Sequence, residues 1–474
     1  MQIVTKGHQS EDAVRQVIQL FFSLSSEMSV CSTLVTENKV TVARASIKMG
    51  DNEVCGEATA SINPENKREV SDLVKKSVFI ACRKISDMPT PWGISTGIRP
   101  AKTARMMLDQ KASDEEIISY MQSELWTTEE KARLSLNVAK REKEILDKRL
   151  KNGISLYIGI PFCPTRCAYC SFISQAKKHN DKFVDQYVLA LMREIEFCAE
   201  LTEKYNLSVE TVYFGGGTPT AISPENLNML LEAVRKNFDL SNTKEYTVEA
   251  GRPDTFSLEM LDVLKNNAVG RISINPQTMN QKTLDRIGRK HTVEQTVEAF
   301  NMARKYDFSI NADLIAGLPE ETPEDFNYTL DELLKLTPDA ITVHTMYLKR
   351  AANLISEFEK YRFTSEVSEM MRIANEKMEN EDYAPYYLYK QKNTLGNLEN
   401  IGFCRNGHEC LYNIYIMEEV HTVLAMGGGA STKMVCGDRI ERIFNPKEAA
   451  DYINRIDEII EKKRNNFLVE GFCD

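Results

Sequence analysis

The chain has 474 residues, with 59 lysines and arginines against 69 aspartates and glutamates, and a formal net charge of −10. Hydrophobic residues make up 42% and charged residues 27%, an ordinary balance that excludes a disordered or collagen-like chain. The acidic balance argues against a non-specific nucleic-acid binder, because such a protein needs a positive field to replace counterions. At roughly 150 residues per domain, the length predicts about three domains.

The compartment can be inferred from apolar runs and cysteine usage. No stretch approaches the roughly 18 consecutive apolar residues of a membrane span. The segment Met1–Gln19 mixes charged and apolar residues, so we expect no signal peptide. The 11 cysteines are an odd number spread along a long chain, which favours a reducing cytosol over a secreted disulfide framework. We therefore predict a cytoplasmic protein in which clustered cysteines mark a metal site or reactive thiols.

Residues 1–150 are predicted to form an α+β domain with a helical arm. Apolar periodicity marks three of its elements: Val14–Leu24 (helix), Lys39–Lys48 (strand) and Val70–Ile85 (helix). The segment Thr90–Pro100, TPWGISTGIRP, is rich in Pro and Gly and breaks the pattern. Asp114–Leu150 is charged and amphipathic, with expected helix caps at Ser113 and Thr127. This last stretch is the predicted arm.

Residues 151–380 alternate buried strands with amphipathic helices. The expected strands are Leu156–Ile160, Val209–Phe214, Tyr246–Glu249, Arg271–Ile274, Phe308–Ile315 and Ala340–Met346. The expected helices are Lys182–Thr202, Pro224–Phe238, Leu258–Asn266, Thr292–Lys305, Pro323–Leu336 and Ala352–Glu376. Such alternation predicts an α/β fold, a parallel sheet curved into a partial (βα)6 barrel. Reactive groups in such sheets lie on the loops that follow the carboxyl ends of the strands.

Residues 381–474 are predicted to form a C-terminal α+β domain. Short strand-like runs are followed by a closing helix near Pro446–Lys463. The run Gly427–Gly429 is interpreted as a tight turn, because it does not follow any of the predicted barrel strands.

The loop after the first predicted barrel strand carries three cysteines. It reads IPFCPTRCAYCSF, Ile160–Phe172, and places Cys163, Cys167 and Cys170 within eight residues. Structural zinc normally takes four protein ligands, and His179 is an oddly placed fourth. An iron–sulfur cluster held by three cysteines leaves one iron open to an exogenous ligand. The spacing favours the cluster, and zinc stays the alternative.

This loop and the other strand ends resemble one family. The matching motifs are YIGIPFCPTRCAYC, YFGGGTPT (Tyr213–Thr220), RISINPQ (Arg271–Gln277), IGRKH (Ile287–His291) and DLIAGLP (Asp313–Pro319). They resemble the radical S-adenosylmethionine (SAM) superfamily and, within it, the oxygen-independent coproporphyrinogen III oxidase family with its haem-chaperone relatives. The resemblance runs from about residue 154 to the C-terminus. TPWGISTGIRP and YKQKNTLGNLENIGF resemble the branch of that family with an extra N-terminal domain.

The resemblance implies the cofactors and the reaction. A 4Fe-4S cluster on Cys163, Cys167 and Cys170 would bind SAM at its open iron, and one electron would cleave SAM to a 5′-deoxyadenosyl radical. That radical would remove hydrogen from the propionates of coproporphyrinogen III, which lose carbon dioxide and become the vinyl groups of protoporphyrinogen IX. The implied partners are a tetrapyrrole substrate or haem, and an electron donor such as flavodoxin or ferredoxin. The C-terminal domain would cover the substrate.

The resemblance also assigns roles to single residues. It places SAM binding on the following residues: Gly215, Gly216, Gly217, Thr218, Glu249, Gln277, Arg289 and Asp313. Tyr157, on the first barrel strand, would lie near the SAM sulfur as the catalytic residue. A glycine run lets a backbone approach a ligand closely, and a carboxylate suits a ligand ammonium. Plain turns, surface polar side chains and a half-buried aromatic ring are the alternative interpretations.

Three departures from the family bear on the substrate. Gly251-Arg252 stands where one Asn or Asp is common, which leaves the geometry of that loop open. Gly159 replaces a His that coproporphyrinogen enzymes commonly carry, and Phe172 replaces a Cys. The haem-chaperone branch also carries Phe there. A haem-trafficking protein, or a radical SAM enzyme such as a methyltransferase on another substrate, therefore stays an alternative.

Three further groups of residues have open interpretations. Cys404, His408 and Cys410 match the spacing of no usual metal site, which favours no metal. Lys349 and Arg350 either pair with substrate carboxylates or form a solvated face. Closely spaced tyrosines either stack on a tetrapyrrole or pack in a sheet, and sheet packing is the commoner case: Tyr383, Tyr386, Tyr387 and Tyr389.

Overall fold

A computed structural model of the chain describes residues 1–22, 27–170, 175–176, 181–347, 365–391, 394–437 and 439–467. It forms two compact units: the first contains Met1–Asn137 and Lys390–Glu399, and the second contains most of the remaining chain. The expected domain boundaries at residues 150 and 380 stay predictions. None of the helices in these ranges is long and apolar enough to cross a membrane.

The first unit is built on a four-stranded sheet. Its strands lie in the order β1 (Gln2–Lys6), β2 (Ser29–Glu37), β3 (Val40–Met49) and β4 (Asn52–Ala60). β1 runs parallel to β2, and the other pairs are antiparallel. Helices α1 (Glu11–Phe21) and α2 (Lys67–Arg83) bury their apolar faces against this sheet and each other, with Val14, Ile18 and Val78 fully buried. The predicted helix–strand–helix pattern is confirmed.

A helical segment follows α2. It contains α3 (Lys102–Asp109), α4 (Asp114–Ser123) and α5 (Glu129–Leu146). The predicted cap at Ser113 is confirmed, because its hydroxyl accepts the Glu116 N–H in a capping box. The predicted cap at Thr127 is wrong by one residue, since the Thr128 hydroxyl accepts the Lys131 N–H at 3.4 Å. Thr127 instead closes the turn after α4, because its N–H donates to the Met121 carbonyl at 3.1 Å.

The two motifs of the branch with the extra domain meet inside the first unit. Trp92 Nε1 donates to Glu399 Oε2 at 2.7 Å, and Lys131 Nζ lies 2.8 Å from Glu399 Oε1. Lys390 Nζ donates to the Ser95 carbonyl at 3.0 Å. Burial lowers the pKa of Lys390 to about 8. These buried polar contacts give the motifs a structural role, because each charged group has a partner.

The second unit contains an 11-stranded sheet. Its strands lie in the order β13 (Ala384–Lys390), β14 (Glu399–Cys404), β12 (Ala340–Thr345), β11 (Ser309–Ala316), β10 (Arg271–Ser273), β9 (Glu245–Val248), β8 (Ser208–Gly216), β5 (Gly153–Ile160), β15 (Thr422–Gly427), β16 (Ser431–Cys436) and β17 (Arg439–Phe444). The strands from β15 to β12 are mutually parallel, and they include all six predicted barrel strands. The predicted α/β fold with a partial barrel is confirmed, with strands added from the tail.

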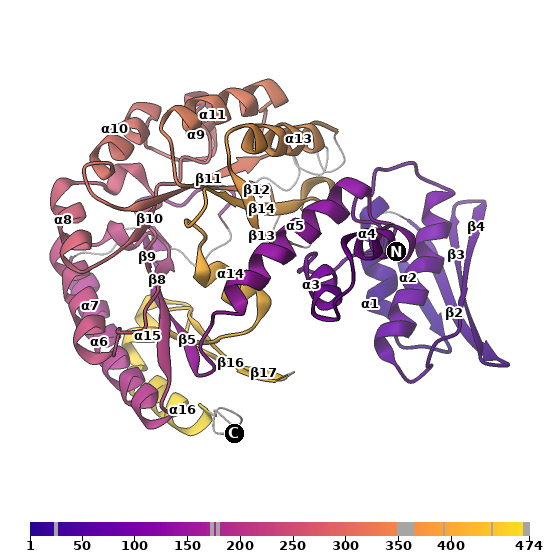
Figure 1. Cartoon of the computed structure of the whole chain (residues 1–474), viewed down its shortest axis with the longest axis horizontal. Helices are drawn as coiled ribbons and strands as arrows, with labels where there is room; N and C mark the ends of the chain where they lie inside the picture. Colours follow the sequence, from indigo (N-terminus) through magenta and orange to yellow (C-terminus); the bar gives the residue numbers. More distant parts are fainter. Residues whose placement is uncertain are drawn as a thin grey trace. The chain divides into compact units, whose positions relative to one another are not determined.

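Helices line the outer side of the curved parallel sheet (Figure 1). They are α6 (Asp181–Lys204), α7 (Pro224–Asn237), α8 (Leu258–Asn266), α9 (Gln281–Arg286), α10 (Val293–Ala303), α11 (Pro323–Lys335) and α13 (Ser365–Asn380). The tail adds α14 (Leu411–Glu418), α15 (Ala449–Asn454) and α16 (Ile456–Asn466). The predicted helices are confirmed, except that residues 352–364 of the last one lie outside the described ranges. Helix α14 lies on the inner side of the sheet (Figure 1).

The tail strand β15 changes the interpretation of the second glycine run. β15 pairs in parallel with β5, with Gly427 opposite Gly159. Gly427 and Gly429 have φ angles of 99° and 72°, which a side chain rarely tolerates, and they turn the chain into β16. The run is therefore the expected tight turn, but it also ends a parallel strand next to the strand that leads to the cysteines. Sequence missed this placement because the pairing of β15 with β5 joins segments about 270 residues apart.

A buried ionic group fixes this turn. Glu194 on α6 and Lys463 on α16 form an ion pair of 2.8 Å, and both side chains are fully buried. Glu194 also accepts the Gly427 N–H at 2.8 Å and the Tyr452 hydroxyl at 2.5 Å. The group joins α6 and α16 to the end of β15, and the bond from the Gly427 N–H to Glu194 holds the turn.

We expect Glu194→Ala to lower the free energy of unfolding by about 3–5 kcal/mol, because it leaves the Lys463 ammonium buried without its carboxylate. Chemical denaturation followed by circular dichroism would measure the change. Glu196→Ala removes an exposed carboxylate from the same helix and should change stability by less than about 0.5 kcal/mol. Equal effects of the two substitutions would contradict the importance of the buried pair.

Candidate cluster and cofactor site

The three cysteines lie in the loop that follows β5. Cys163 ends the short strand β6 (Phe162–Cys163), and the Cys170 N–H donates to the Cys167 carbonyl at 3.1 Å. All three thiols are partly exposed and outside any disulfide. Within the described ranges, no three Cys, His, Asp or Glu side chains are arranged around a single metal ion. A cuboidal cluster does not require such an arrangement, since each thiolate binds a different iron.

The glycine run after β8 is bound to the start of the cysteine loop by backbone hydrogen bonds. The Gly217 N–H donates to the Ile160 carbonyl at 2.8 Å, and the Thr218 N–H donates to the Phe162 carbonyl at 2.7 Å. A Cβ atom at position 217 would lie 2.5 Å from the Phe162 carbonyl oxygen, and Gly216 has a φ of 114°. Glycine is therefore required here by the close approach of two backbones.

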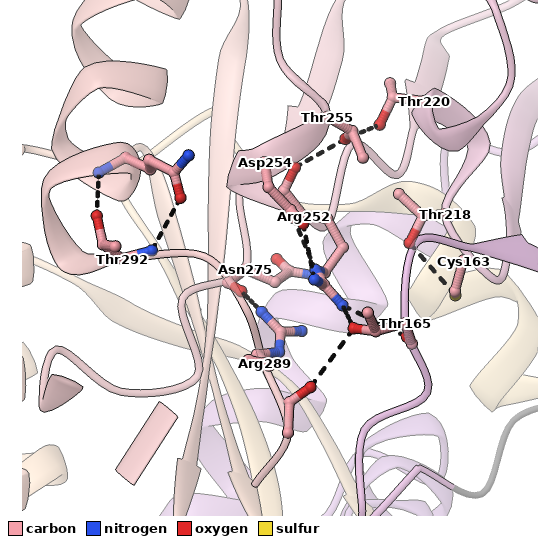
Figure 2. Close-up of polar contacts among 12 residues, drawn as sticks. Cys163, Thr165, Thr218, Thr220, Arg252, Asp254, Thr255, Asn275, Arg289 and Thr292 are labelled. Carbon is pink, nitrogen blue, oxygen red and sulfur yellow. Dashed lines mark hydrogen bonds and ion pairs between the residues drawn. The ribbon is translucent and has the colours of Figure 1, made fainter. Parts of the chain in front are cut away.

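These contacts restrict what the run can offer a ligand. The N–H groups of Gly217 and Thr218 are already engaged by the Ile160 and Phe162 carbonyls. The Thr218 hydroxyl lies 3.5 Å from Cys163 Sγ, a contact drawn in Figure 2. Gly217 and Thr218 therefore offer no unengaged backbone N–H to a ligand. The expected role of the glycine run in SAM binding stays a prediction.

Glu249 follows β9 and is the carboxylate that faces the glycine run. Tyr213 donates a hydrogen bond from its hydroxyl to Glu249 Oε1. A Cβ at Gly215 would lie 2.9 Å from Tyr213 Cε1 and 3.1 Å from Glu249 Oε2, so a side chain at this position would crowd the carboxylate. Burial raises the pKa of Glu249 to about 7, although the bond from Tyr213 works to lower it. The carboxylate is thus poised to change charge near neutral pH.

Three stacked tyrosines lie beside Glu249. The ring centroids of Tyr213 and Tyr412 are 4.4 Å apart, and Tyr157 lies 6.3 Å from each of them. Tyr157 and Tyr213 come from the neighbouring strands β5 and β8, whereas Tyr412 comes from α14 in the tail. Sequence reasoning missed Tyr213 and Tyr412. The strand pairing of β5 with β8 could have suggested Tyr213, but no local signal marks Tyr412.

Asp313 lies at the centre of β11 and accepts from Asn311 Nδ2 at 2.8 Å. His344 on β12 lies 3.6 Å from it, measured between Nε2 and Oδ2. Burial works to raise the pKa of Asp313, but the His344 imidazole and neighbouring donors hold that pKa below its usual value. Gln277 adopts a φ of 70°, and its N–H donates to the Asp313 carbonyl at 3.0 Å. These two expected SAM ligands are therefore brought together by a backbone hydrogen bond.

Arg289 connects the sheet edge to the cysteine loop. The residue is 7% exposed, and its Nη1 donates to the Asn275 carbonyl, as Figure 2 shows. Burial works to lower the pKa of Arg289, but the nearby Tyr169 and Cys167 raise it. Arg289 Nε is buried without a hydrogen-bond partner among the described residues. One donor of this arginine thus remains for an anionic ligand.

Arg252, the departure from the family pattern after β9, is also buried. It is 3% exposed and forms two bonds of 2.8 Å with the Asp254 carboxylate. Its Nη1 donates to Thr165 Oγ1 in the cysteine loop at 3.0 Å (Figure 2). Burial lowers the pKa of the neighbouring His291 to about 3, and the charges of Arg289 and Arg252 act in the same direction. His291 is therefore neutral beside the two arginines.

The tail residues Cys404, His408 and Cys410 are held by separate partners. Arg141 Nη2 lies 3.6 Å from Cys404 Sγ, and Cys410 Sγ lies 3.4 Å from Glu245 Oε1. His408 Nδ1 lies 2.9 Å from the Ser309 hydroxyl. Burial raises the pKa of Cys404 to about 12. These contacts favour the interpretation without a metal.

The remaining candidates are explained by packing or lie outside the described ranges. Tyr386 and Tyr387 are buried in the tail core, and Tyr389 hydrogen-bonds His344 through its hydroxyl at 3.1 Å. A Cβ at Gly159 would lie 3.3 Å from the Met426 carbonyl oxygen, which makes a larger side chain there tight. Four residues named above lie outside the ranges whose side chains are described: Phe172, His179, Lys349 and Arg350.

The described residues fit the implied cofactors. Partly exposed thiols in one short loop suit a cluster with an open iron. The half-buried carboxylate of Glu249 and the unpartnered Arg289 Nε suit a ligand with an amino and a carboxylate group. The cysteine loop, Gly215 and Glu249 lie at the carboxyl ends of β5, β8 and β9, where ligands bind in such sheets, and Arg289 lies in the loop after α9.

Comparison with known proteins identifies the family. The model of the Radical SAM superfamily matches residues 157–333. The oxygen-independent coproporphyrinogen-III oxidase-like protein HemZ of Bacillus subtilis is 41% identical over 380 residues, which cover 78% of this chain and 76% of HemZ. The heme chaperone HemW of Lactococcus lactis is 29% identical over 327 residues, covering 68% of this chain and 81% of HemW.

Comparison with solved structures agrees with the sequence comparison. Coproporphyrinogen III oxidase HemN from Escherichia coli, described as a radical SAM enzyme, superposes with a TM-score of 0.52 at 26% identity and covers 67% of this chain and 72% of its own. The similarity to HemZ spans more than three quarters of both chains, and it includes the cysteine loop and the strand ends described above. The chain therefore belongs to the oxygen-independent coproporphyrinogen III oxidase-like family of the radical SAM superfamily, whose cofactors are a 4Fe-4S cluster and SAM.

Proposed function

We propose that the chain oxidatively decarboxylates coproporphyrinogen III without oxygen and converts its propionates to vinyl groups. The observation that carries this proposal is the 41% identity to HemZ over 78% of the chain. Each conversion removes carbon dioxide, one hydrogen atom and one further electron from a propionate, so the reaction needs both a hydrogen-atom acceptor and an electron acceptor. A cytosolic location and a flavodoxin or ferredoxin as electron donor are part of the proposal.

The cysteine loop is assigned to the cluster in this proposal. Cys163, Cys167 and Cys170 would each bind one iron and leave the fourth iron open. When bound, the cluster and SAM supply the radical chemistry that removes hydrogen from the substrate. The Thr218 hydroxyl, 3.5 Å from Cys163 Sγ, can donate to a thiolate there. Hydrogen bonds to cluster sulfurs stabilise the reduced state, so this contact favours electron uptake.

The strand ends are assigned to SAM. Glu249 would accept the amino group of SAM, and Tyr213 would hold that carboxylate in place. Arg289 would pair with the SAM carboxylate through the donor that lacks a partner. Asp313 and Gln277 would bind the ribose and adenine. The fixed contacts of these side chains before ligand arrives reduce the ordering that binding requires.

Tyr157 is assigned to the reacting end of SAM. Its ring centroid lies 6.3 Å from that of Tyr213 on β8 and 6.3 Å from that of Tyr412 on α14, so it contacts both the barrel and the tail. Its burial raises the pKa of the hydroxyl, so the residue stays protonated near neutral pH. A neutral, apolar wall at this place would exclude water from a reactive centre.

A haem-trafficking function is the second candidate, and Gly159 together with the similarity to HemW favours it. Such a protein would share the fold and the cofactor site but would bind haem and leave coproporphyrinogen unchanged. Where the coproporphyrinogen enzymes commonly carry the imidazole of a His, this chain has Gly159. At this position the backbones of β5 and β15 lie close together.

We expect the anaerobically reconstituted chain to contain one cuboidal cluster. Replacing Cys163, Cys167 or Cys170 by Ala should abolish it, because each thiolate is a ligand and the described residues near the loop offer no substitute. Iron and sulfide analysis with absorption spectra would measure the loss. Cys410→Ala should retain the cluster, since that thiol bonds Glu245. Stoichiometric zinc without iron in a fresh anaerobic preparation would disprove the assignment.

SAM binding should weaken as pH falls through about 7, by up to about tenfold per pH unit below the pKa of Glu249, because the protonated carboxyl no longer attracts an amino group. Isothermal titration of the cluster-containing protein between pH 6 and 8 would show this. Glu249→Gln should bind SAM weakly and lose that part of the pH dependence. An unchanged pH profile in this variant would remove Glu249 from the SAM site.

Incubation with SAM, a reductant and coproporphyrinogen III without oxygen should yield a product that lacks one or two carboxyl groups, with a matching rise in 5′-deoxyadenosine. Mass spectrometry and chromatography would detect both. Tight haem binding without decarboxylation would instead support the trafficking function. SAM cleavage with neither result would point to another substrate.

A further inference from the structure

Arg252 is a buried cation whose described hydrogen bonds lie within the protein. Its side chain is 3% exposed, in the loop that joins β9 to the short helix η2 (Pro253–Thr255). Nε and Nη2 each lie 2.8 Å from an oxygen of Asp254, in the two-pronged geometry that a guanidinium forms with a carboxylate. The pair compensates the buried charge, so Arg252 does not need an anionic ligand to be stable there.

The remaining nitrogen of Arg252 reaches the cysteine loop. Nη1 donates to Thr165 Oγ1 at 3.0 Å and lies 3.5 Å from the Thr165 carbonyl oxygen. Thr165 lies midway between Cys163 and Cys167, two residues from each. One guanidinium nitrogen therefore contacts both the side chain and the backbone at the centre of the Cys163–Cys167 segment (Figure 2).

The loop after α9 also holds the cysteine loop, through two hydrogen bonds. The Thr165 hydroxyl donates to the Gly288 carbonyl at 3.4 Å, and the Ala168 N–H donates to the Ile287 carbonyl at 2.9 Å. Thr165 thus accepts from the loop after β9 and donates to the loop after α9. Its hydroxyl uses both of its hydrogen-bonding capacities to connect three loops.

We propose that Arg252 is a positioning residue for the cluster: with Asp254 as its anchor, it holds Thr165 so that the thiols of Cys163 and Cys167 keep the separation that the cluster requires. The inference rests on the assignment of the cluster to these cysteines and is independent of the substrate. It also accounts for the Gly251-Arg252 pair. The family commonly has a shorter residue here, and the arginine in its place links the loop after β9 to the cysteine loop.

Arg252→Lys keeps the charge but loses the fork that serves Asp254 and Thr165 together. In the reconstituted full-length chain, we expect a chelator to bleach the cluster roughly tenfold faster than in wild type, since hydrogen bonds to charged groups are among the stronger ones. Thr165→Val keeps the side-chain shape, removes the accepting hydroxyl and should accelerate bleaching similarly. The double variant should bleach no faster than the faster single variant, because both remove the same contact.

Arg271→Lys is the matched control. Arg271 is also buried, at 5% exposure, but its Nη1 donates to the His408 carbonyl at 2.8 Å, away from the cysteine loop. This variant should lose stability without faster bleaching. The electron paramagnetic resonance spectrum of the reduced cluster should change in Arg252→Lys and not in Arg271→Lys. Bleaching at the wild-type rate in Arg252→Lys, or equal acceleration in both arginine variants, would overturn the positioning role. Absence of any cluster in wild type would instead overturn the cysteine assignment and this inference with it.

Discussion

The hydrogen bonds between the backbone after β8 and the backbone after β5 are the constraint on which the rest of the site depends. The Gly217 and Thr218 N–H groups bond the Ile160 and Phe162 carbonyls, so the two strand ends stay paired beyond the sheet. A side chain at Gly217 would separate them, because its Cβ would lie 2.5 Å from the Phe162 oxygen. This pairing places the first cysteine beside the Thr218 hydroxyl, and the position of the cysteine loop follows from it.

Much of the fold could be predicted from the sequence, because its signals are local. Apolar runs that end in Gly or polar residues, each followed by an amphipathic helix, marked the six barrel strands and placed their carboxyl ends at one edge. The expected positions of Glu249 and Gln277 after their strands follow from the same logic, since parallel strands bring their ends together, whereas Asp313 lies within β11 and Arg289 follows α9. The contacts between these side chains depend on register, which no local pattern specifies.

The parts that the sequence concealed all depend on distant pairing. β15 joins the sheet beside β5, and α14 brings Tyr412 onto Tyr213, although each partner lies about 200 residues or more away in the chain. Arg252 had the appearance of an irregularity, because its partner Thr165 lies 87 positions earlier. Close contacts of this kind close long loops and carry no periodic signal, so composition and spacing could not show them.

The two buried arginines beside the cysteine loop differ in whether all of their hydrogen-bond donors are satisfied within the protein. The hydrogen bonds of the Arg252 guanidinium end on Asp254 and Thr165, so its donors are satisfied without a ligand. Arg289 bonds Asn275 but keeps Nε buried without a partner in the described part of the chain. An unmet buried donor costs stability, roughly 1–3 kcal/mol, and it is retained where a ligand completes it. The same residue type therefore fixes the loop at one position and leaves a place for an anion at the other.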